Sequence, residues 1–540
     1  MSLEQSPILE AREKALSHFL SLDNPFLDIQ TFAKAQISLL VGDRVESDLT
    51  ENKHMLVSGL EKLVEQLEPA RRFNETYIGH MLSQPSIPGL FGTEIAQIIN
   101  SNTVASEVSR VETKLEKEAI DFILQDIIGY KETEELKPSG TFTSGGTMAN
   151  MAALTVARRL MPSRYPQLFR EELRNGVKKE VFIQGGKRMK VFVIPQKHYS
   201  IPKAIDVLGG PNYQIELEYI ATKDLRMSVA DLEEKIDKAE KDGTPIMAII
   251  GIAGETETGI VDPLNEIVKI AESHHIFSIA DGAYGASYRL SRNGKLFEGL
   301  DRFDAVVWDP HKTGYIPYGA GFVGFKNVNH HIELGRDIDA PYIGIQAENS
   351  REEETDKLLK QFLDSGEERA LGRKRFEGSM SAAPQLSILA TKYTLGKDGL
   401  AIIYDITLDR IDHLYEKLKS SEFLSPFPDK DPDLNLLCFR LKPEIQYALR
   451  LTDNKKLIEF INKSRLWLDK NIERNGGYYL SNTELKLDNY DPENSETLLP
   501  VWRAVIMNPR TTDVILDEAV NVLEGYIKEK LLALSSAYQS

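Results

Sequence analysis

A short stretch at residues 308–321 contains the residues with the clearest capacity for chemistry. Asp309-Pro310-His311-Lys312 follows Ala305-Val306-Val307-Trp308, an apolar, β-branched run that predicts a buried strand. Lys312 is therefore expected just past a strand end, where α/β folds place reactive groups. Because Pro310 keeps Asp309 out of the helical region, and glycines and prolines follow, we expect Lys312 on a turn. A lysine in a partly desolvated turn is a suitable amine for an imine with an aldehyde cofactor.

A glycine-rich turn is the second candidate for chemistry. Ser144-Gly145-Gly146-Thr147 precedes residues 148–160, whose Ala, Leu and Met content predicts a helix. Glycines let the backbone approach an anion, and the N–H groups and dipole of a helix N-terminus attract phosphate. The turn therefore fits a phosphate cup, although a small-residue helix cap explains the same pattern.

Strands and helices alternate between residues 181 and 280, as they do in a doubly wound parallel sheet. Strands are expected at 191–194, 215–219, 246–251 and 277–280, and helices at 201–208, 229–242 and 264–274. Three of these strands are followed by polar or small residues, which include His198, Thr256, and Asp281 with Ala283. Since the carboxyl ends of parallel strands meet at one edge, we expect these side chains to converge on one crevice.

This set of residues matches the needs of pyridoxal phosphate, which acts as an electron sink. The cofactor requires a lysine, a carboxylate against its ring nitrogen, a phosphate cup, and flat or small groups on its two ring faces. Lys312, Asp281, the turn at Gly146, and His198 with Ala283 supply all four. An anionic Asp281 keeps the pyridine nitrogen protonated, so that the ring accepts the electrons left by a broken bond.

With these residues, the chain resembles the group II pyridoxal-phosphate-dependent amino-acid decarboxylases of fold type I, and among them the bacterial tyrosine decarboxylases. The motifs that carry the likeness are Tyr77-Ile78-Gly79-His80-Met81, Ser144-Gly145-Gly146-Thr147, His198-Tyr199-Ser200, Asp281-Gly282-Ala283-Tyr284-Gly285, Asp309-Pro310-His311-Lys312, Phe376-Glu377-Gly378-Ser379, Tyr479-Leu480-Ser481-Asn482-Thr483 and Trp502-Arg503-Ala504-Val505-Ile506-Met507-Asn508-Pro509. The resemblance covers about residues 70 to 510. The sequence departs from the family at Glu255, where threonine is common, and at Gly282, where alanine is common.

The resemblance implies an α/β protein of fold type I, similar to aspartate aminotransferase, with a mostly parallel central sheet. We expect an N-terminal helical arm at 1–100, a large cofactor-binding domain at 101–392 and a C-terminal α+β small domain at 393–540. The resemblance also implies a homodimer.

Other elements follow from the residue patterns. In the arm, helices are expected at 8–20, 29–40 and 55–67, and a further helix at 106–128. In the small domain, a long helix is expected at 393–418, strands at 436–441, 477–480 and 501–507, and a closing helix at 512–534. For Arg503, a structural ion pair is favoured over a carboxylate site.

The resemblance also implies roles for individual residues. Lys312 carries the imine, Asp281 pairs with the pyridine nitrogen, and His198 stacks on the ring. Around them, Gly146 and Thr147 hold the phosphate with Asp309 and His311 near it, and Thr256 and Ala283 line the ring. A tyrosine on a mobile loop protonates the substrate Cα in this family, and Tyr342 is its match here.

Two further features concern the substrate and its access to the site. Tyr77, His80, Tyr342 and Ser481 suit a pocket for a phenol. The polar run 346–374 has the character of a lid that excludes water, and a solvated helix hairpin explains it equally well.

These features predict decarboxylation of an L-amino acid to its amine and carbon dioxide. An aromatic substrate such as tyrosine is favoured, with glutamate or aspartate left open. An aldehyde lyase or a transaminase shares the fold and changes only the bond that is broken. A catalytically silent binding protein would have lost a required group, and a serine hydrolase built on Ser144 has no histidine and acid partner placed by the sequence.

Composition narrows the remaining possibilities. A chain of 540 residues, 41% hydrophobic and 27% charged, predicts a globular protein of two or three domains. The net charge of -17 disfavours a nucleic-acid partner. With no apolar stretch long enough to span a membrane and a polar N-terminus, we expect a cytoplasmic protein without a signal peptide. The single cysteine, Cys438, excludes disulfides within the chain and cysteine metal clusters, and the ten histidines show no metal-ligand spacing.

Overall fold

The structure is a computed structural model. It describes residues 73–104, 109–174, 177–182, 187–209, 214–335, 375–470, 478–491, 494 and 497–536, together with residues 62, 63 and 66. The helices expected at 8–20 and 29–40, and most of the one expected at 55–67, lie outside these residues. The first complete helix is α4 (Ile87–Ile99).

A seven-stranded sheet forms the centre of the larger part of the molecule. Its strand order is β1-β11-β10-β9-β8-β4-β5. The strands are β1 (Ser139–Thr143), β4 (Met189–Val193), β5 (Ile215–Tyr219), β8 (Ile246–Ile252), β9 (Phe277–Asp281), β10 (Ala305–Trp308) and β11 (Gly321–Phe325). Only β11 is antiparallel to its neighbours, whereas every pair from β10 to β5 is parallel. The predicted α/β class with a mostly parallel sheet is confirmed.

Helices cover the strands of this sheet. Every residue of β8, β9 and β10 is buried, as expected for parallel strands covered on both faces. The helices that connect or cover them are α6 (Gly146–Arg159), α8 (Ser200–Gly209), α9 (Val229–Lys241) and α10 (Leu264–Ser273). These bounds agree with the sequence pattern to within two residues, because apolar periodicity sets which face of each helix is buried.

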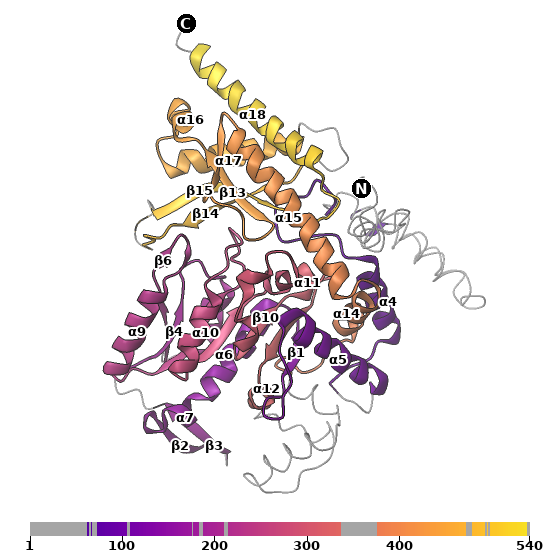
Figure 1. Ribbon diagram of the computed structural model, residues 1–540, viewed down its shortest axis with the longest axis vertical. Coiled ribbons are helices and arrows are strands. Elements are labelled where there is room, and N and C mark those ends of the chain that lie inside the picture. Colours follow the sequence, from indigo (N-terminus) through magenta and orange to yellow (C-terminus); the bar gives the residue numbers. More distant parts are fainter. Residues whose placement is uncertain are drawn as a thin grey trace, which may run out of the picture.

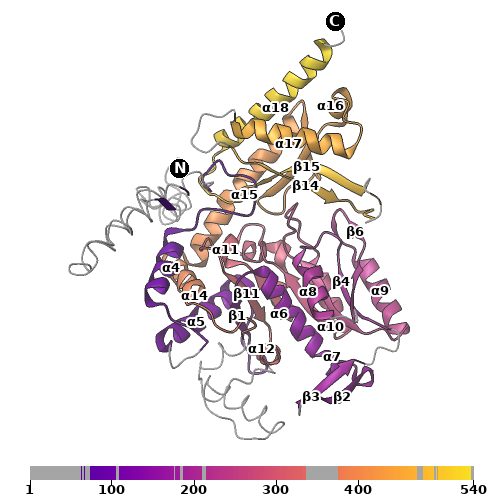
Figure 2. The same ribbon diagram turned by 180° about the vertical axis from the view of Figure 1, so that it is seen from behind.

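A second, four-stranded antiparallel sheet lies beyond the first (Figure 1). Its order is β12 (Leu424–Phe427), β13 (Leu436–Leu441), β15 (Leu498–Val505) and β14 (Ser481–Lys486). The helices α15 (Gly396–Ser420), α17 (Asn454–Lys470) and α18 (Asp513–Ser536) belong to the same part of the chain. Both views show α15 running from beside this sheet to α14 (Ala383–Thr394), which lies next to α4 (Figure 2).

Three element predictions were wrong in detail. The helix expected at 106–128 is α5 (Arg110–Phe122) followed by a π-helical segment, η3 (Ile123–Ile128), which Gly129 ends at a φ of 94°. The helix expected at 393–418 is α15, which begins at Gly396 because Leu395 separates it from α14. The strand expected at 477–480 is found later in the chain, as β14, which begins at Ser481. Within the expected range Tyr479 makes only an isolated bridge to Tyr77.

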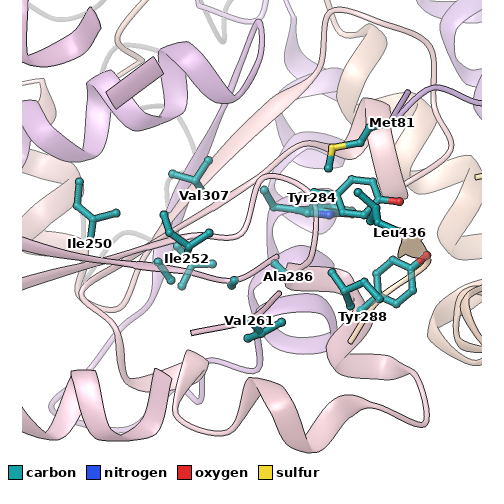
Figure 3. Close-up of a cluster of buried hydrophobic side chains, with 14 of the residues drawn as sticks. Met81, Ile250, Ile252, Val261, Tyr284, Ala286, Tyr288, Val307 and Leu436 are labelled. Carbon is teal, nitrogen blue, oxygen red and sulfur yellow. The ribbon is translucent and has the colours of Figure 1, made fainter. Parts of the chain in front are cut away.

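A cluster of buried apolar side chains joins the two sheets (Figure 3). It includes Met81 from the segment before α4, Tyr284 from the loop after β9, and Leu436 from the start of β13. The Tyr284 hydroxyl donates a hydrogen bond to Asn435 Oδ1 at 2.6 Å. The second sheet is therefore fixed directly over the loop that follows β9.

We expect Leu436→Ala to lower the free energy of unfolding by about 2–5 kcal/mol, because it opens a cavity in this cluster. Leu436 is 1% exposed. The matched control is Leu466→Ala on α17, where the side chain is 56% exposed; its effect should stay within about 0.5 kcal/mol. Urea unfolding followed by tryptophan fluorescence measures both, and equal losses would contradict the packing described here.

Candidate active site

Lys312 lies in a single helical turn just past the end of β10. This turn, α11 (Pro310–Thr313), has Pro310 in its first turn and Asp309 as its N-cap residue in extended conformation (φ -107°, ψ 95°). The expected conformation of Asp309 is confirmed, and so is the expected turn at Lys312, which takes the form of one helical turn that ends at Thr313. A proline is compatible with the first helical position because no backbone N–H is needed there.

Asp309 is the buried anion of this turn. Its Oδ2 lies 3.0 Å from Lys312 Nζ and 3.5 Å from His311 Nε2. The side chain of Asp309 is 3% exposed, and its Oδ1 has no hydrogen-bond partner among the described residues. The Asp309 backbone N–H donates to the carbonyl of Ala283 at 2.9 Å, which ties this turn to the loop after β9.

Asp281 ends β9 and is also buried. Its Oδ2 accepts a hydrogen bond from Asn150 Nδ2 at 3.1 Å, and the same amide donates to Ser200 Oγ at 3.1 Å. Ser200 Oγ in turn lies 2.8 Å from His198 Nδ1. The chain Asp281–Asn150–Ser200–His198 thus connects β9, α6 and the start of α8. In the part of the chain that the structure describes, Asp281 has no cationic partner.

The glycine-rich turn reaches the same place. Gly146 is the first residue of α6, and a methyl group added there would lie 2.8 Å from Asp309 Oδ2 and 3.2 Å from Ala283 Cβ. Only glycine therefore fits this close approach. Thr147 follows in the first turn of α6, and the Ser144 backbone N–H donates to Glu377 Oε2 at 2.9 Å.

These residues fit the phosphate and ring of pyridoxal phosphate. The fourteen-residue helix α6 presents its N-terminus beside the turn, which suits a phosphate. Two buried side-chain oxygens, Asp309 Oδ1 and Asn150 Oδ1, have no hydrogen-bond partner among the described residues, which suits a site that a ligand completes. Asp281 offers the unpaired carboxylate that a pyridinium requires.

Both histidines of the site are held neutral. Burial lowers the pKa of His198, with the positive charge of Lys312 acting in the same direction and Asp281 opposing it. Burial likewise lowers the pKa of His311. The Ala320 backbone N–H donates to His311 Nδ1 at 3.1 Å, so that nitrogen is an acceptor. Tyr318 stacks on the His311 ring with centroids 4.1 Å apart.

Thr256 and Glu255 lie in the loop after β8. The Glu255 carboxylate accepts hydrogen bonds from the backbone N–H groups of Glu257 and Thr258. Burial, together with the charge of Glu257, raises the pKa of Glu255 well above its usual range. The departure from the family's threonine at this position therefore supplies a loop-stabilising carboxyl group.

A second polar cluster surrounds Arg503 on β15. Its Nε donates to Ser481 Oγ at 3.1 Å, its Nη1 to the Thr256 carbonyl at 3.0 Å, and its Nη2 to His80 Nδ1 at 2.8 Å. Arg503 is 7% exposed, and no carboxylate pairs with it within the described ranges. The ion pair favoured by the sequence is therefore not found there.

His80 links Arg503 to two aromatic rings. Its Nε2 lies 3.1 Å from the Tyr479 hydroxyl. Tyr479 stacks on Tyr77 with centroids 4.9 Å apart and an angle of 2° between the rings. Burial, then the charges of Arg503 and Arg465, lower the pKa of His80 to about 4.

The two clusters are joined along the segment before α4. The Ser86 backbone N–H donates to the carbonyl of Tyr315 at 2.7 Å, three residues after Lys312. The Tyr315 hydroxyl donates to the carbonyl of Met507 at 3.1 Å, two residues past β15. Residues 77–86 thus lie between the Lys312 turn and the second sheet.

Most candidates from the sequence meet in these two clusters. The first contains Gly146, His198, Asp281, Ala283, Asp309, His311 and Lys312, and the second contains Tyr77, His80, Thr256 and Ser481. Tyr77 and Ser481 are buried. Tyr342 and the run 346–374 lie outside the described residues.

Sequence reasoning did not identify Asn150 as a site residue. An asparagine within the alanine-rich buried face of α6 was the available signal, because a buried amide needs partners.

Comparisons with known proteins identify a family for this chain. The family model described as the pyridoxal-dependent decarboxylase conserved domain matches residues 50–356. The chain is similar to aspartate 1-decarboxylase of Aliivibrio fischeri, with 28% identity over 97% of this chain and 91% of that protein. It is also similar to aromatic-L-amino-acid decarboxylase of Bacillus atrophaeus, with 28% identity over 72% and 68% of the two chains. Among solved structures, Oryza sativa TDC with PLP and tryptamine has a TM-score of 0.71 at 15% identity, covering 98% of this chain and 99% of that one.

The pKa of His80 predicts an acid-dependent loss of stability. Its folded value of about 4 lies below the ordinary value of 6.5, so the stabilisation is complete above pH 6.5 and is lost as the pH falls towards 4. Arg503 and Arg465 are the charged groups that face the ring, and Tyr479 is the titratable one. His80→Asn should remove about 1–2 kcal/mol of the loss seen between pH 7 and pH 4, after allowance for partial exposure.

Urea unfolding at a series of pH values measures this difference. His413→Asn on α15 is the matched control and should follow the wild type, since that ring lies beside Asp517 at the surface of the second sheet's helices. An identical pH dependence in wild type and His80→Asn would contradict a neutral, buried His80.

Proposed function

The chain belongs to the pyridoxal-dependent decarboxylase family and is a pyridoxal-phosphate-dependent amino-acid decarboxylase, and we propose that its substrate is an acidic L-amino acid, with L-aspartate the first choice. The product would then be β-alanine and carbon dioxide. This choice revises the order suggested by the sequence, in which an aromatic substrate came first.

The observation that carries this proposal is the unpaired cation at Arg503. The buried guanidinium of Arg503 is held by a serine hydroxyl, backbone carbonyls and a neutral imidazole, and none of these partners carries a negative charge. Burying a charge without an opposite charge is costly. A substrate carboxylate at Arg503 would offset that cost, and bidentate geometry would orient it.

A second cation strengthens the case for an acidic substrate. Arg465 on α17 lies over the Tyr479 ring, 5.6 Å from its centroid, and adds to the positive potential that lowers the pKa of His80. Such a potential favours a substrate with a second carboxylate over a neutral phenol. The similarity to aspartate 1-decarboxylase over 97% of this chain supports the same choice.

We assign the cofactor contacts residue by residue. Lys312 Nζ would hold the aldehyde, Asp281 the pyridine nitrogen, and Gly146 with Thr147 the phosphate. The remaining contacts would be His198 and Ala283 on the ring faces, Thr256 at the ring's edge, and Asp309 and His311 near the phosphate. When bound, the cofactor supplies an electron sink for the bond broken at Cα.

The protein's own residues then do the remaining work. Asn150 fixes Asp281 through its hydrogen bond, and Asp309 holds the Lys312 amine at 3.0 Å. Arg503 would orient the substrate, and orientation lowers the barrier by removing the need to find the reactive geometry. Delivery of a proton to Cα by Tyr342 stays a prediction.

An aromatic L-amino acid is the second candidate substrate. The stacked pair of Tyr77 and Tyr479 provides flat apolar surface beside Arg503, and the similarity to an aromatic-L-amino-acid decarboxylase supports it. The nearer likeness to tyrosine decarboxylases stays a prediction, as do the division at residues 100 and 392 and the cytoplasmic location.

A homodimer is also proposed, through the face formed by α4, α5 and α14. These helices pack together, and their exposed apolar side chains are Phe91, Ile98, Ile99, Val111 and Tyr393. An apolar face of this kind marks an interaction surface, and a symmetric pair would cover it on both copies.

Amine formation tests the proposed reaction. Purified protein with pyridoxal phosphate is incubated separately with each common L-amino acid, and the products are identified by mass spectrometry. We expect β-alanine from aspartate, at a rate that falls by at least about 10³-fold in Lys312→Ala. Lys326→Ala, a surface lysine that pairs with Glu272, is the control and should keep the wild-type rate.

Each outcome of this assay has a defined meaning. Tyramine or another aromatic amine in place of β-alanine would transfer the proposal to the second candidate. Release of no amine from any amino acid by cofactor-loaded protein would overturn the proposed substrates.

Sedimentation velocity tests the proposed dimer. Ile98 is 84% exposed on α4, so Ile98→Arg should leave the fold intact while placing a charge in the apolar face. We expect a wild-type dimer and at least a tenfold weaker association in the variant, since one buried charge costs more than about 1.4 kcal/mol. The control is Tyr447→Arg on α16 (Pro443–Ala448), outside the three helices of the proposed interface. Tyr447 is 85% exposed, and this variant should stay dimeric.

A further inference from the structure

The His80 ring lies between the guanidinium of Arg503 and the hydroxyl of Tyr479. The guanidinium can only donate hydrogen bonds, whereas the hydroxyl can donate or accept. Arg503 Nη2 lies 2.8 Å from His80 Nδ1, and the Tyr479 hydroxyl lies 3.1 Å from His80 Nε2. The segment that carries His80 is itself fixed at Ile78, two residues before the imidazole. The backbone N–H of Ile78 donates to the Tyr479 carbonyl at 3.0 Å, and that of Val505 donates to the Ile78 carbonyl at 2.9 Å.

The chemistry of these partners fixes the tautomer of the ring. A guanidinium has five N–H donors and no acceptor, so Nδ1 must present its lone pair to Arg503. The ring proton then lies on Nε2 and is donated to the Tyr479 oxygen. A doubly protonated ring would set N–H against N–H at 2.8 Å, so the contact with Arg503 exists only for the neutral form.

His80 is the main hydrogen-bond partner of one Arg503 nitrogen, Nη2. Nε is fixed by Ser481 Oγ and Nη1 by the Thr256 carbonyl. Nη2 has the short contact to His80 and a longer one, 3.4 Å, to the Gly79 carbonyl. Loss of the imidazole acceptor would leave Nη2 with a single weak bond and allow the guanidinium to turn.

We propose that His80 is a positioning residue of this decarboxylase, a neutral Nε2–H imidazole that orients the Arg503 guanidinium towards a substrate carboxylate and ties it to the Tyr479 hydroxyl. This role rests on the proposed use of Arg503 as the carboxylate-binding group. It replaces direct contact of His80 with a substrate phenol, the role that the resemblance alone implied.

Three substitutions separate the two hydrogen bonds. In His80→Asn the side-chain oxygen stands near the Nδ1 position and accepts from Arg503, whereas His80→Gln reaches the Nε2 position and donates to Tyr479. His80→Leu removes both bonds at similar size. His413→Leu, on α15 where the ring contacts Asp517, is the matched control.

The first readout is the binding of succinate to the cofactor-loaded full-length protein by isothermal titration calorimetry. We expect His80→Leu and His80→Gln to weaken succinate binding about tenfold or more, which corresponds to loss of one charged hydrogen bond. His80→Asn should recover most of the affinity, and the His413 control should not change. The absorbance of bound cofactor should be equal in all four.

The second readout is steady-state kinetics on whichever amino acid the wild type decarboxylates. KM should rise by about the same factor in the Leu and Gln variants, with a smaller fall in kcat, because the interaction serves binding more than the bond-breaking step. A merely structural role would affect Asn and Leu alike, so equal losses in those two variants would overturn the proposal. Unchanged KM in the Leu and Gln variants would overturn it as well.

These results are separable from failure of the proposed substrate. If the wild type decarboxylates only an aromatic amino acid and does not bind succinate, the acidic substrate is wrong. The ranking of the three variants by KM still decides the role of His80 in that case. If thermal unfolding shows that His80→Leu does not fold, the KM values and succinate affinities of His80→Asn and His80→Gln test the role of His80 instead.

Discussion

The parallel register of β8, β9 and β10 is the constraint on which the site depends. It sets Ile252, Asp281 and Val307 side by side, so that the residues that follow each strand emerge at one edge of the sheet. Asp281 ends one strand, and Asp309 and Lys312 follow the next. The tie between the Asp309 N–H and the Ala283 carbonyl fixes the two loops to each other. A change of one residue in this register would turn Asp281 to the opposite face.

Burial of charge explains why so many polar side chains surround that edge. Asp281 and Asp309 are both buried, and a buried carboxyl group needs hydrogen-bond or charge partners to offset the loss of water. Asn150 serves the first, whereas Lys312 and His311 serve the second. Burial also keeps both site histidines neutral. The result is a site whose charges are held in fixed positions, which is the arrangement that electrostatic catalysis requires.

The second sheet contributes a buried cation, Arg503, in contrast to the buried carboxylates of the first sheet. Arg503 reaches the site from β15 and is held by neutral acceptors from three separate segments of the chain. Residues 77–86 lie between the two sheets and bond to both. The apolar cluster around Tyr284 and Leu436 keeps this assembly in place (Figure 3). With the contacts proposed above, recognition of the substrate and positioning of the cofactor would come from different sheets, and the packing between the sheets would set their relative geometry.

The sequence by itself determined the parallel strands, the helices between them and the convergence of His198, Asp281 and Lys312, because apolar periodicity and strand-end polarity are local signals. It did not determine the helical turn at α11, the break at Leu395 or the start of β14 at Ser481, since proline, glycine and short strands are compatible with more than one local conformation. Only the tertiary structure decided the surroundings of Arg503. Its partners lie more than 20 residues away along the chain, at residues 79, 80, 256 and 481. Whether a buried arginine meets a carboxylate or neutral acceptors depends on contacts between distant segments, which no local pattern records.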